Sequence, residues 1–277
     1  MKSGLKQNIK LAGMLLYFFG LTVAAGLKYY YSNASADDLL WILYPTAVSV
    51  EHMTGLHFIR EAQSGFINYS KEICIAPACS GVNFLIISFC MVFFSFVRQI
   101  HSQGLRWLWL VISLSGSYIL TVIVNSVRIV ISIFLIDNNI HYGWLTSARI
   151  HRLEGVVLYF LFLSIFYIVI KRIIVLRNRS DKEGNIRDVV CGSHKVSEAA
   201  VPLFWYLFVT LTIPLVNGSY QQQGMLFIEH SLMVLFSCLS IFLLIHWMRL
   251  YSKMILIKIG ISMKNYSGKI TAEEQYK

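Results

Sequence analysis

The sequence predicts an all-α fold: a polytopic membrane helix bundle of about six transmembrane helices, with a small extracytoplasmic cap before Cys79. Three observations support this prediction. The 277 residues are 56% hydrophobic and have a mean hydropathy of +0.62, more apolar than soluble domains. Several apolar stretches approach or exceed the length that crosses a bilayer. Lysine and arginine gather in alternate loops, as on the cytoplasmic side of membrane proteins.

Six apolar stretches are the predicted spans. In chain order they are residues 11–27, 82–97, 107–136, 153–170, 201–216 and 225–248. The first follows Lys2, Lys6 and Lys10 in the manner of a signal peptide. No small-residue cleavage site precedes a soluble domain, so we interpret this stretch as a retained signal anchor. Pro214 interrupts the shorter fifth stretch near its end.

A further apolar segment, residues 39–50, decides the orientation of the chain. It has only 12 residues and contains Pro45, which favours an interfacial or re-entrant segment over a span. If it does not cross and the N-terminus is cytoplasmic, 18 of the 24 basic residues fall in cytoplasmic pieces. A crossing would invert every later loop and violate the positive-inside rule repeatedly. We therefore predict six spans with both termini in the cytoplasm.

The chain divides by composition into three regions. Residues 1–170 form a membrane core with four of the spans, and residues 171–199 read as a basic cytoplasmic linker. Residues 200–277 add a two-helix membrane region with a basic cytoplasmic tail. Within the core, the outer loop 51–78 has isolated polar residues, two glycines and the short run 73–77 (ICIAP). It predicts a small strand-bearing or irregular cap.

Charge and cysteine usage exclude other classes of protein. The formal charge of +10 is spread over predicted cytoplasmic loops and makes no patch for nucleic acid. The five cysteines have no repeated CxxC spacing, so we predict neither a disulfide framework nor a metal site, and no cofactor. Cys90 and Cys238 lie within spans and are interpreted as packing residues. A regulatory disulfide between Cys74 and Cys79 is an alternative that the spacing leaves open.

Three residues predict a reactive site because they share one depth in the bilayer. Arg128 lies 21 residues after Trp107, or about 32 Å along a helix, which places it close to the outer interface of a core about 30 Å thick. Cys79 and His151 each precede a span that enters from outside. A thiol, a guanidinium and an imidazole together can supply a nucleophile, a charge stabiliser and a proton shuttle.

The neighbours of these residues fit the same chemistry. Ser80 can cap the helix that Pro77 opens, and the N-terminus of a helix favours a cysteine thiolate. Asn125 shares a helix face with Arg128 and could orient it, and Glu154 could hold His151.

Each residue also has an ordinary interpretation: an inert or palmitoylated cysteine, an arginine that reaches the headgroups, an interfacial histidine without a role. Glu229 and His230 could extend the site, although a packing pair is favoured.

The same residues resemble the exosortase/archaeosortase family, and within it the exosortase K group. The similar segments are 76–85 (APACSGVNFL), 125–129 (NSVRI) and 151–155 (HRLEG), within a resemblance that runs over about residues 1–170. The resemblance implies a multi-pass cysteine transpeptidase of the bacterial cytoplasmic membrane with its active site facing outside. Its substrates would be secreted proteins that end in a short motif, a membrane helix and a basic tail.

By position, the resemblance makes Cys79 the nucleophile, Arg128 the oxyanion or thiolate stabiliser and His151 the general acid and base. In some family members an arginine occupies the third position, so Arg152 is an alternative to His151. The acceptor of the cleaved protein, the role of residues 171–277 and the oligomeric state stay open. Two other classes fit the composition: a small polytopic transporter in which Arg128 is a counter-charge, and a non-enzymatic membrane assembly protein.

Overall fold

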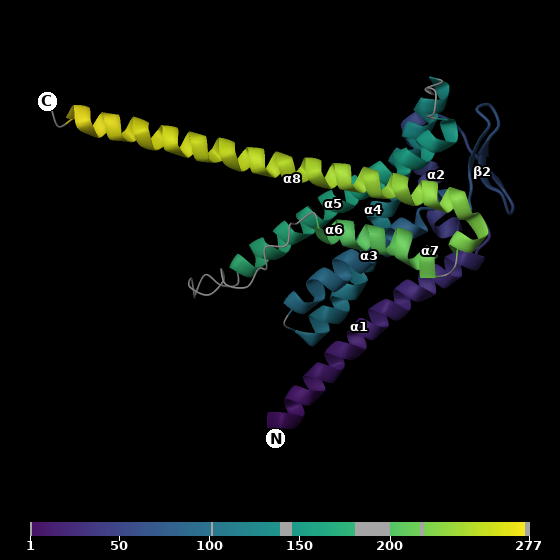
Figure 1. Cartoon of the computed structure of the whole chain (residues 1–277). Coiled ribbons are helices and arrows are strands. Elements are labelled where there is room, and N and C mark those ends of the chain that lie inside the picture. The colour runs from purple at the N-terminus through teal and green to yellow at the C-terminus, as the bar shows by residue number, and fades with distance from the viewer. Residues whose placement is uncertain (1, 101, 139–145, 181–199, 217–218, 275–277) are drawn as a thin grey trace.

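The computed structural model describes residues 2–100, 102–138, 146–180, 200–216 and 219–274 as a mostly helical chain (Figure 1). The long helices are α1 (Lys2–Asn33), α2 (Leu40–Thr54), α3 (Val82–Phe96), α4 (Gln103–Asp137), α5 (Ser147–Ser180) and α8 (Ser219–Glu274). The short helices are α6 (Ala200–Leu207) and α7 (Ile213–Val216), and the strands are β1 (Ile59–Glu61), β2 (Gly65–Asn68) and β3 (Ile73–Ile75).

Among the described residues, four helical segments are long and apolar enough to cross a membrane. They are Pro77–Gln99, Gln103–Asp137, Arg149–Arg177 and Gly224–Met248, and Ala200–Leu215 is a shorter apolar helix. The predicted spans 82–97, 107–136 and 153–170 each fall inside one of the four, and 225–248 does so as well. The prediction of an all-α membrane bundle is confirmed in this coarse form, and the number of six spans stays a prediction.

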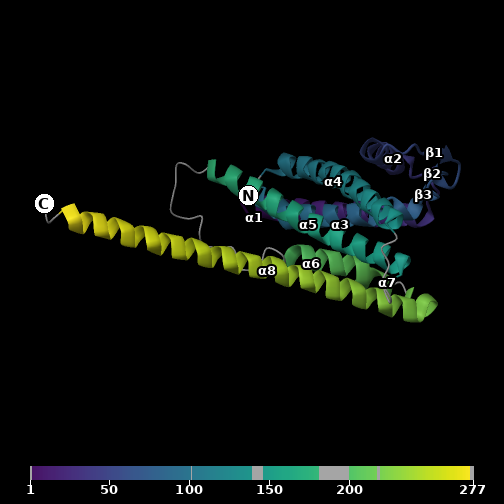
Figure 2. The ribbon, with the colours of Figure 1, turned by 90° about the horizontal axis from the view of Figure 1, so that it is seen from above.

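The predicted cap contains strands. β1, β2 and β3 form one antiparallel sheet in that order, with Ile67 of β2 opposite Ile59 on one side and Cys74 on the other. Figures 1 and 2 show the sheet beside α2 at one end of the bundle. Since β3 ends only a few residues before Cys79, the cap and the candidate nucleophile are close neighbours along the chain.

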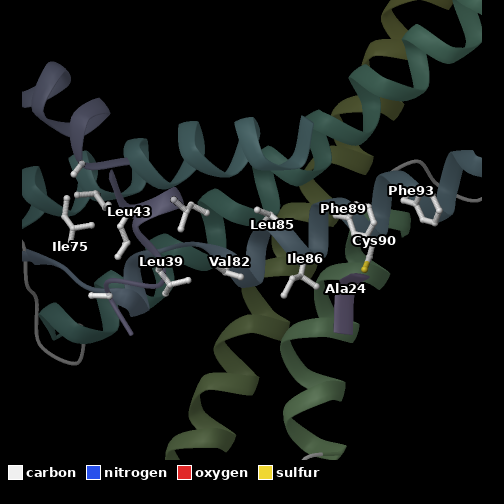
Figure 3. Close-up of a cluster of buried hydrophobic side chains, with 14 of the residues drawn as sticks. Ala24, Leu39, Leu43, Ile75, Val82, Leu85, Ile86, Phe89, Cys90 and Phe93 are labelled. Carbon is white, nitrogen blue, oxygen red and sulfur yellow. The ribbon is translucent and has the colours of Figure 1, made fainter. Parts of the chain in front are cut away.

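α3 is the centre of the bundle. Twelve of its 15 residues are buried, because its two faces belong to two different hydrophobic clusters. One cluster joins α3 to α1, α2, the cap and α4, and Figure 3 shows part of it, with Ala24, Leu43 and Ile75 contributing from outside α3. The other joins α3 to α5, α6 and α8. A helix covered on all sides needs no polar face, which explains its unbroken apolar sequence.

Two of the predicted regions are closely joined to the membrane core in the structure. α5 continues without a break past residue 171, the predicted start of the linker, to Ser180; residues 181–199 lie outside the described part of the chain. The predicted additional region 200–277 shares a core with the first four spans. Tyr206 of α6, and Val234 and Cys238 of α8, pack with Phe84 and Phe160 of α3 and α5. The chain beyond α5 therefore helps to hold the helices that carry the candidate site.

The irregular points of the tail have local causes. Between α6 and α7 the backbone forms a π-helical turn, Phe208–Thr212, just before Pro214. Proline has no N–H to donate to the carbonyl four residues earlier and its ring clashes there, so the helix widens. Inside α8 the backbone at Gly224 is non-helical, with φ 39° and ψ −108°. The apolar segment Gly224–Met248 begins at this kink.

Candidate active site

Cys79 lies at the junction between the cap and α3. After β3 the chain makes one turn of 3-10 helix, Pro77–Cys79, in which the Cys79 N–H donates to the Ala76 carbonyl at 2.8 Å. Gly81 then takes a left-handed conformation, φ 73°, and α3 begins at Val82. The prediction that Ser80 caps this helix is wrong: Gly81 is the capping residue, and the Ser80 hydroxyl is buried without making the cap hydrogen bond.

Gly81 also allows α3 to approach α4 closely. A Cβ at position 81 would lie 3.0 Å from Cγ2 of Thr121 and 3.3 Å from Cγ of Asn125. Glycine is therefore required twice here, for its positive φ and for its missing side chain. Asn125 uses this proximity to donate a hydrogen bond from its side-chain amide to the Cys79 carbonyl.

Tyr159 of α5 connects the cysteine segment to Arg128. Its hydroxyl donates to Oδ1 of Asn125 at 2.9 Å and accepts from the Arg128 guanidinium at 3.1 Å, and the guanidinium carbon lies 5.4 Å from the centre of the tyrosine ring. Asn125 has no direct bond to Arg128, so the prediction that it orients the arginine holds only through Tyr159. Sequence reasoning missed Tyr159, although it lies eight residues after His151 on the same helix face.

His151 joins the arginine to a carboxylate. Its Nε2 lies 2.9 Å from Nη2 of Arg128, and its Nδ1 lies 2.9 Å from the hydroxyl of Ser132. Ser132 donates to Oε2 of Glu154 at 2.7 Å, whereas the direct distance from Nδ1 to Oε2 is 3.8 Å. Glu154 thus reaches the imidazole through a serine that sequence reasoning missed. Ser132 lies four residues after Arg128, one helical turn along the same face.

A cavity of about 490 Å³ opens beside these groups. Cys79, Ser132, His151 and Glu154 line it, together with Glu72 and Cys74 of the cap region. The remaining wall is mostly aliphatic, formed by Ile73, Ile75, Ile129, Ile133, Ile136 and Ile150 among others. Of the two candidates for the third position, His151 is the one that lines the cavity.

Two charged side chains of the site are packed so closely that polar atoms in them are buried. Within the described residues, Nε of Arg128 and Oε1 of Glu154 are buried polar atoms without a hydrogen-bond partner. Buried polar atoms are nearly always paired in proteins, and exceptions are often functional. Gly155 contributes to this packing, since a Cβ there would lie 3.0 Å from Nε of Arg128.

The other predicted residues lie outside this network. Glu229 forms an ion pair with Arg149 at 2.7 Å that joins α8 to the start of α5, and neither Glu229 nor His230 lines the cavity.

Cys90 and Cys238 are buried in the hydrophobic clusters, as predicted. Cys74 and Cys79 are both free thiols, so the alternative of a disulfide between them is not realised here. Burial raises the pKa of the Cys74 thiol, as do Cys79 and Glu61 nearby.

Comparison of the chain with models of known protein families, with curated proteins and with solved structures gives no match. In the part of the chain that the structure describes, no group of three or more His, Cys, Asp or Glu side chains is arranged to hold a metal ion.

Proposed function

We propose that the protein is a membrane-embedded cysteine transpeptidase or protease that cleaves the C-terminal sorting signals of secreted proteins. The observation that carries the proposal is the gathering of three groups from distant parts of the sequence: Cys79 and His151 line one cavity, and Arg128 is hydrogen-bonded to His151. The resemblance of the segments around these residues to the exosortase/archaeosortase family supports it. Transfer of the cleaved protein to a cell-surface acceptor would complete the reaction.

The cavity suits a peptide segment that enters beside the nucleophile. Its volume of about 490 Å³ falls within the range of ordinary ligand pockets. The wall from β3, α4 and α5 is largely aliphatic, which favours apolar side chains next to the scissile bond. The hydrogen-bonding groups of the cavity wall lie around Cys79 and His151. A bound peptide would need hydrogen-bond partners there for its scissile carbonyl and its leaving amine.

In the first half of the reaction, His151 takes the proton of the Cys79 thiol and the sulfur attacks the carbonyl carbon of the substrate. Negative charge then develops on the carbonyl oxygen, and Arg128 stabilises it. The carbon–nitrogen bond breaks as His151 returns the proton to the leaving amine. The products are a thioester on Cys79 and the detached membrane helix with its basic tail.

In the second half, an acceptor attacks the thioester carbonyl. The acceptor is water in a hydrolysis, or an amine or hydroxyl of the cell surface in a transpeptidation. It gives its proton to His151, and the same proton goes to the departing Cys79 sulfur, which restores the free enzyme. No metal or cofactor takes part in this scheme.

The localisation is part of the proposal. In the bacterial cytoplasmic membrane, six spans with both termini inside would put Cys79 and the cap on the outer face. The positive-inside bias supports this orientation, because 18 of the 24 basic residues would lie on the inner side.

The proposal is tested with a co-expressed secreted protein of the same genome that ends in a short motif, a membrane helix and a basic cluster. Cys79→Ala should abolish its processing while the variant is still made and inserted. Cys74→Ala is the matched control, because Cys74 lines the same cavity and should be dispensable. Processing that continues in the Cys79→Ala strain would rule the function out.

The transporter alternative has less support. Arg128 would have to bind the transported ion, but its guanidinium is already hydrogen-bonded to His151 and Tyr159. Transporters place broken helices at their binding sites. The irregular segments found here, Phe208–Thr212 and Gly224, do not line the cavity.

A further inference from the structure

The side chains around His151 form a chain of hydrogen bonds with a single direction. The chain begins at Nη2 of Arg128 and passes through Nε2 and Nδ1 of the imidazole to the Ser132 hydroxyl and Oε2 of Glu154. Its three links measure 2.9, 2.9 and 2.7 Å. α4 supplies the arginine and the serine, and α5 supplies the histidine and the glutamate.

The direction follows from what each group can donate. A guanidinium has only donors, so Nε2 of His151 must accept from Arg128 with its lone pair. A neutral imidazole with a bare Nε2 carries its hydrogen on Nδ1. Nδ1 therefore donates to the Ser132 oxygen, and the serine hydroxyl is left to donate to Glu154. The opposite direction at Nδ1 would require an imidazole with no N–H.

We propose that Ser132 and Glu154 are positioning residues that fix the tautomer of His151, so that Nε2 is the atom that accepts and returns the catalytic proton. This inference rests on the proposed function. The pair plays the role that an aspartate plays beside the histidine of serine hydrolases, with a serine hydroxyl between carboxylate and imidazole.

The arrangement couples two events. When Nε2 accepts the thiol proton it becomes a donor, and it can then no longer accept from Arg128. The guanidinium is thereby released at the moment when charge develops on the substrate oxygen. The positive charge of the imidazolium is balanced by Glu154, whose side chain is only 6% exposed, through the hydroxyl of Ser132.

Matched variants of Ser132 separate the hydroxyl from the shape of the side chain. Ser132→Val and Ser132→Thr differ only in the hydroxyl, so Ser132→Thr should restore most of the activity that Ser132→Val loses. Glu154→Gln keeps the shape and removes the charge. Ser126→Val is the control on the same helix, because within the described residues the Ser126 hydroxyl donates only to the Val122 carbonyl. Thermal unfolding in detergent establishes that each variant is folded.

Two readouts are measured. The first is the rate at which the co-expressed protein of the previous section is processed, which should fall about tenfold or more in Ser132→Val and Glu154→Gln. The second is the alkylation of Cys79 by iodoacetamide between pH 5 and 9, followed by peptide mass spectrometry in the full-length protein. Without Glu154 the thiolate–imidazolium pair is less favoured, so the alkylation profile should move to higher pH.

The charged and titratable groups that face His151 in this range are Arg128, Glu154, Glu72, Cys74 and Cys79. Cys74→Ala in every background removes the second thiol of the cavity from the measurement. Alkylation profiles of Ser132→Val and Glu154→Gln that superimpose on those of Ser132→Thr and Ser126→Val would overturn the positioning role. That result is distinct from failure of the proposed function, which Cys79→Ala reports by itself and which leaves the alkylation test intact.

Discussion

α3 and the apolar part of α8 are equally hydrophobic in sequence but lie in opposite environments. In the most apolar window of Pro77–Gln99, 83% of the residues are buried inside the protein, whereas in Gly224–Met248 the share is 17%. α3 is covered by protein on both faces, and the segment Gly224–Met248 of α8 presents most of its side chains outward. Hydropathy alone therefore predicts that a helix avoids water, but not whether lipid or protein covers it. The candidate nucleophile, Cys79, directly precedes the helix that protein covers.

The largest expected effect is on the free energy of unfolding, when a phenylalanine is replaced by alanine in α3 and, for comparison, in α8. Phe89 of α3 is fully buried and Phe236 of α8 is 68% exposed. Phe89→Ala should lower the free energy of unfolding by about 3–5 kcal/mol, because it leaves a cavity in a packed core. Phe236→Ala should change it by less than about 0.5 kcal/mol. Unfolding in one detergent compares the two variants, and equal losses would mean that α8 is as enclosed as α3.

The second effect concerns the glycines where α4 meets α5. Gly155→Ala would bring a methyl group 3.0 Å from Nε of Arg128, so the guanidinium must move. Under the proposed mechanism, displacement of Arg128 should lower the processing rate about tenfold to a hundredfold. Gly116→Ala meets only Cζ of Phe166, at 3.8 Å, and should leave processing unchanged. If both variants process the co-expressed protein equally well, the position of Arg128 is not critical for the reaction.

A third, smaller effect compares the start of α3 with an exposed position of α1. Gly81→Ala forces an alanine to φ 73° and against Thr121, which should cost about 1–2 kcal/mol. At Gly26, in the interior of α1, a new Cβ has nothing within 4 Å. Gly26→Ala should therefore stabilise the protein by about 0.5–1 kcal/mol, since alanine favours helix over glycine. Thermal unfolding of both variants measures the contrast, and the two shifts should have opposite signs.

The smallest effect belongs to the cap, which depends on exposed polar contacts. The hydrogen bond from Arg60 of β1, with a second from the Gln63 backbone, holds the pKa of Asp37 below its ordinary value of 3.8. Because this pKa is lowered on folding, the pair stabilises the cap above about pH 4 and loses its contribution as the pH falls through the lowered value. Asp37→Asn should unfold the cap more easily at neutral pH, with the difference from wild type shrinking toward pH 3.

Hydrogen exchange of the β1 and β2 amides follows this change in the cap separately from the bundle. A difference between Asp37→Asn and wild type that stays constant from pH 6 to pH 3 would contradict an ionic origin. Because both side chains of the pair are largely exposed, added salt should weaken the effect.

The sequence was sufficient for the positions of the apolar helices, because each needs a run of hydrophobic residues whatever covers it. It was not sufficient for their ends. α5 continues to Ser180 through residues 171–180, where arginine and lysine interrupt the apolar sequence but are compatible with a helix. Nor could it show that α6 and α8 share the core of α3, since buried and lipid-facing residues are equally apolar.

The candidate site was predictable in part for a similar reason. Cys79, Arg128 and His151 stand out because reactive or charged groups next to membrane spans are unusual. Ser132 and Tyr159 are ordinary residues for helices, and only the three-dimensional pairing of α4 with α5 gives them significance. Helical spacing places Ser132 on the face of Arg128 and Tyr159 on the face of His151, but it does not distinguish them from the other residues of those faces.

The carbonyl of Cys79 accepts a hydrogen bond from Asn125 of α4, and Asn125 accepts one from Tyr159 of α5. The backbone just before α3 is therefore fixed by two other helices. A fluorophore or spin label attached to the sulfur at position 79 would consequently report on the packing of α3, α4 and α5. Spectra from such a label would report whether a purified preparation keeps its native assembly, before any substrate is known.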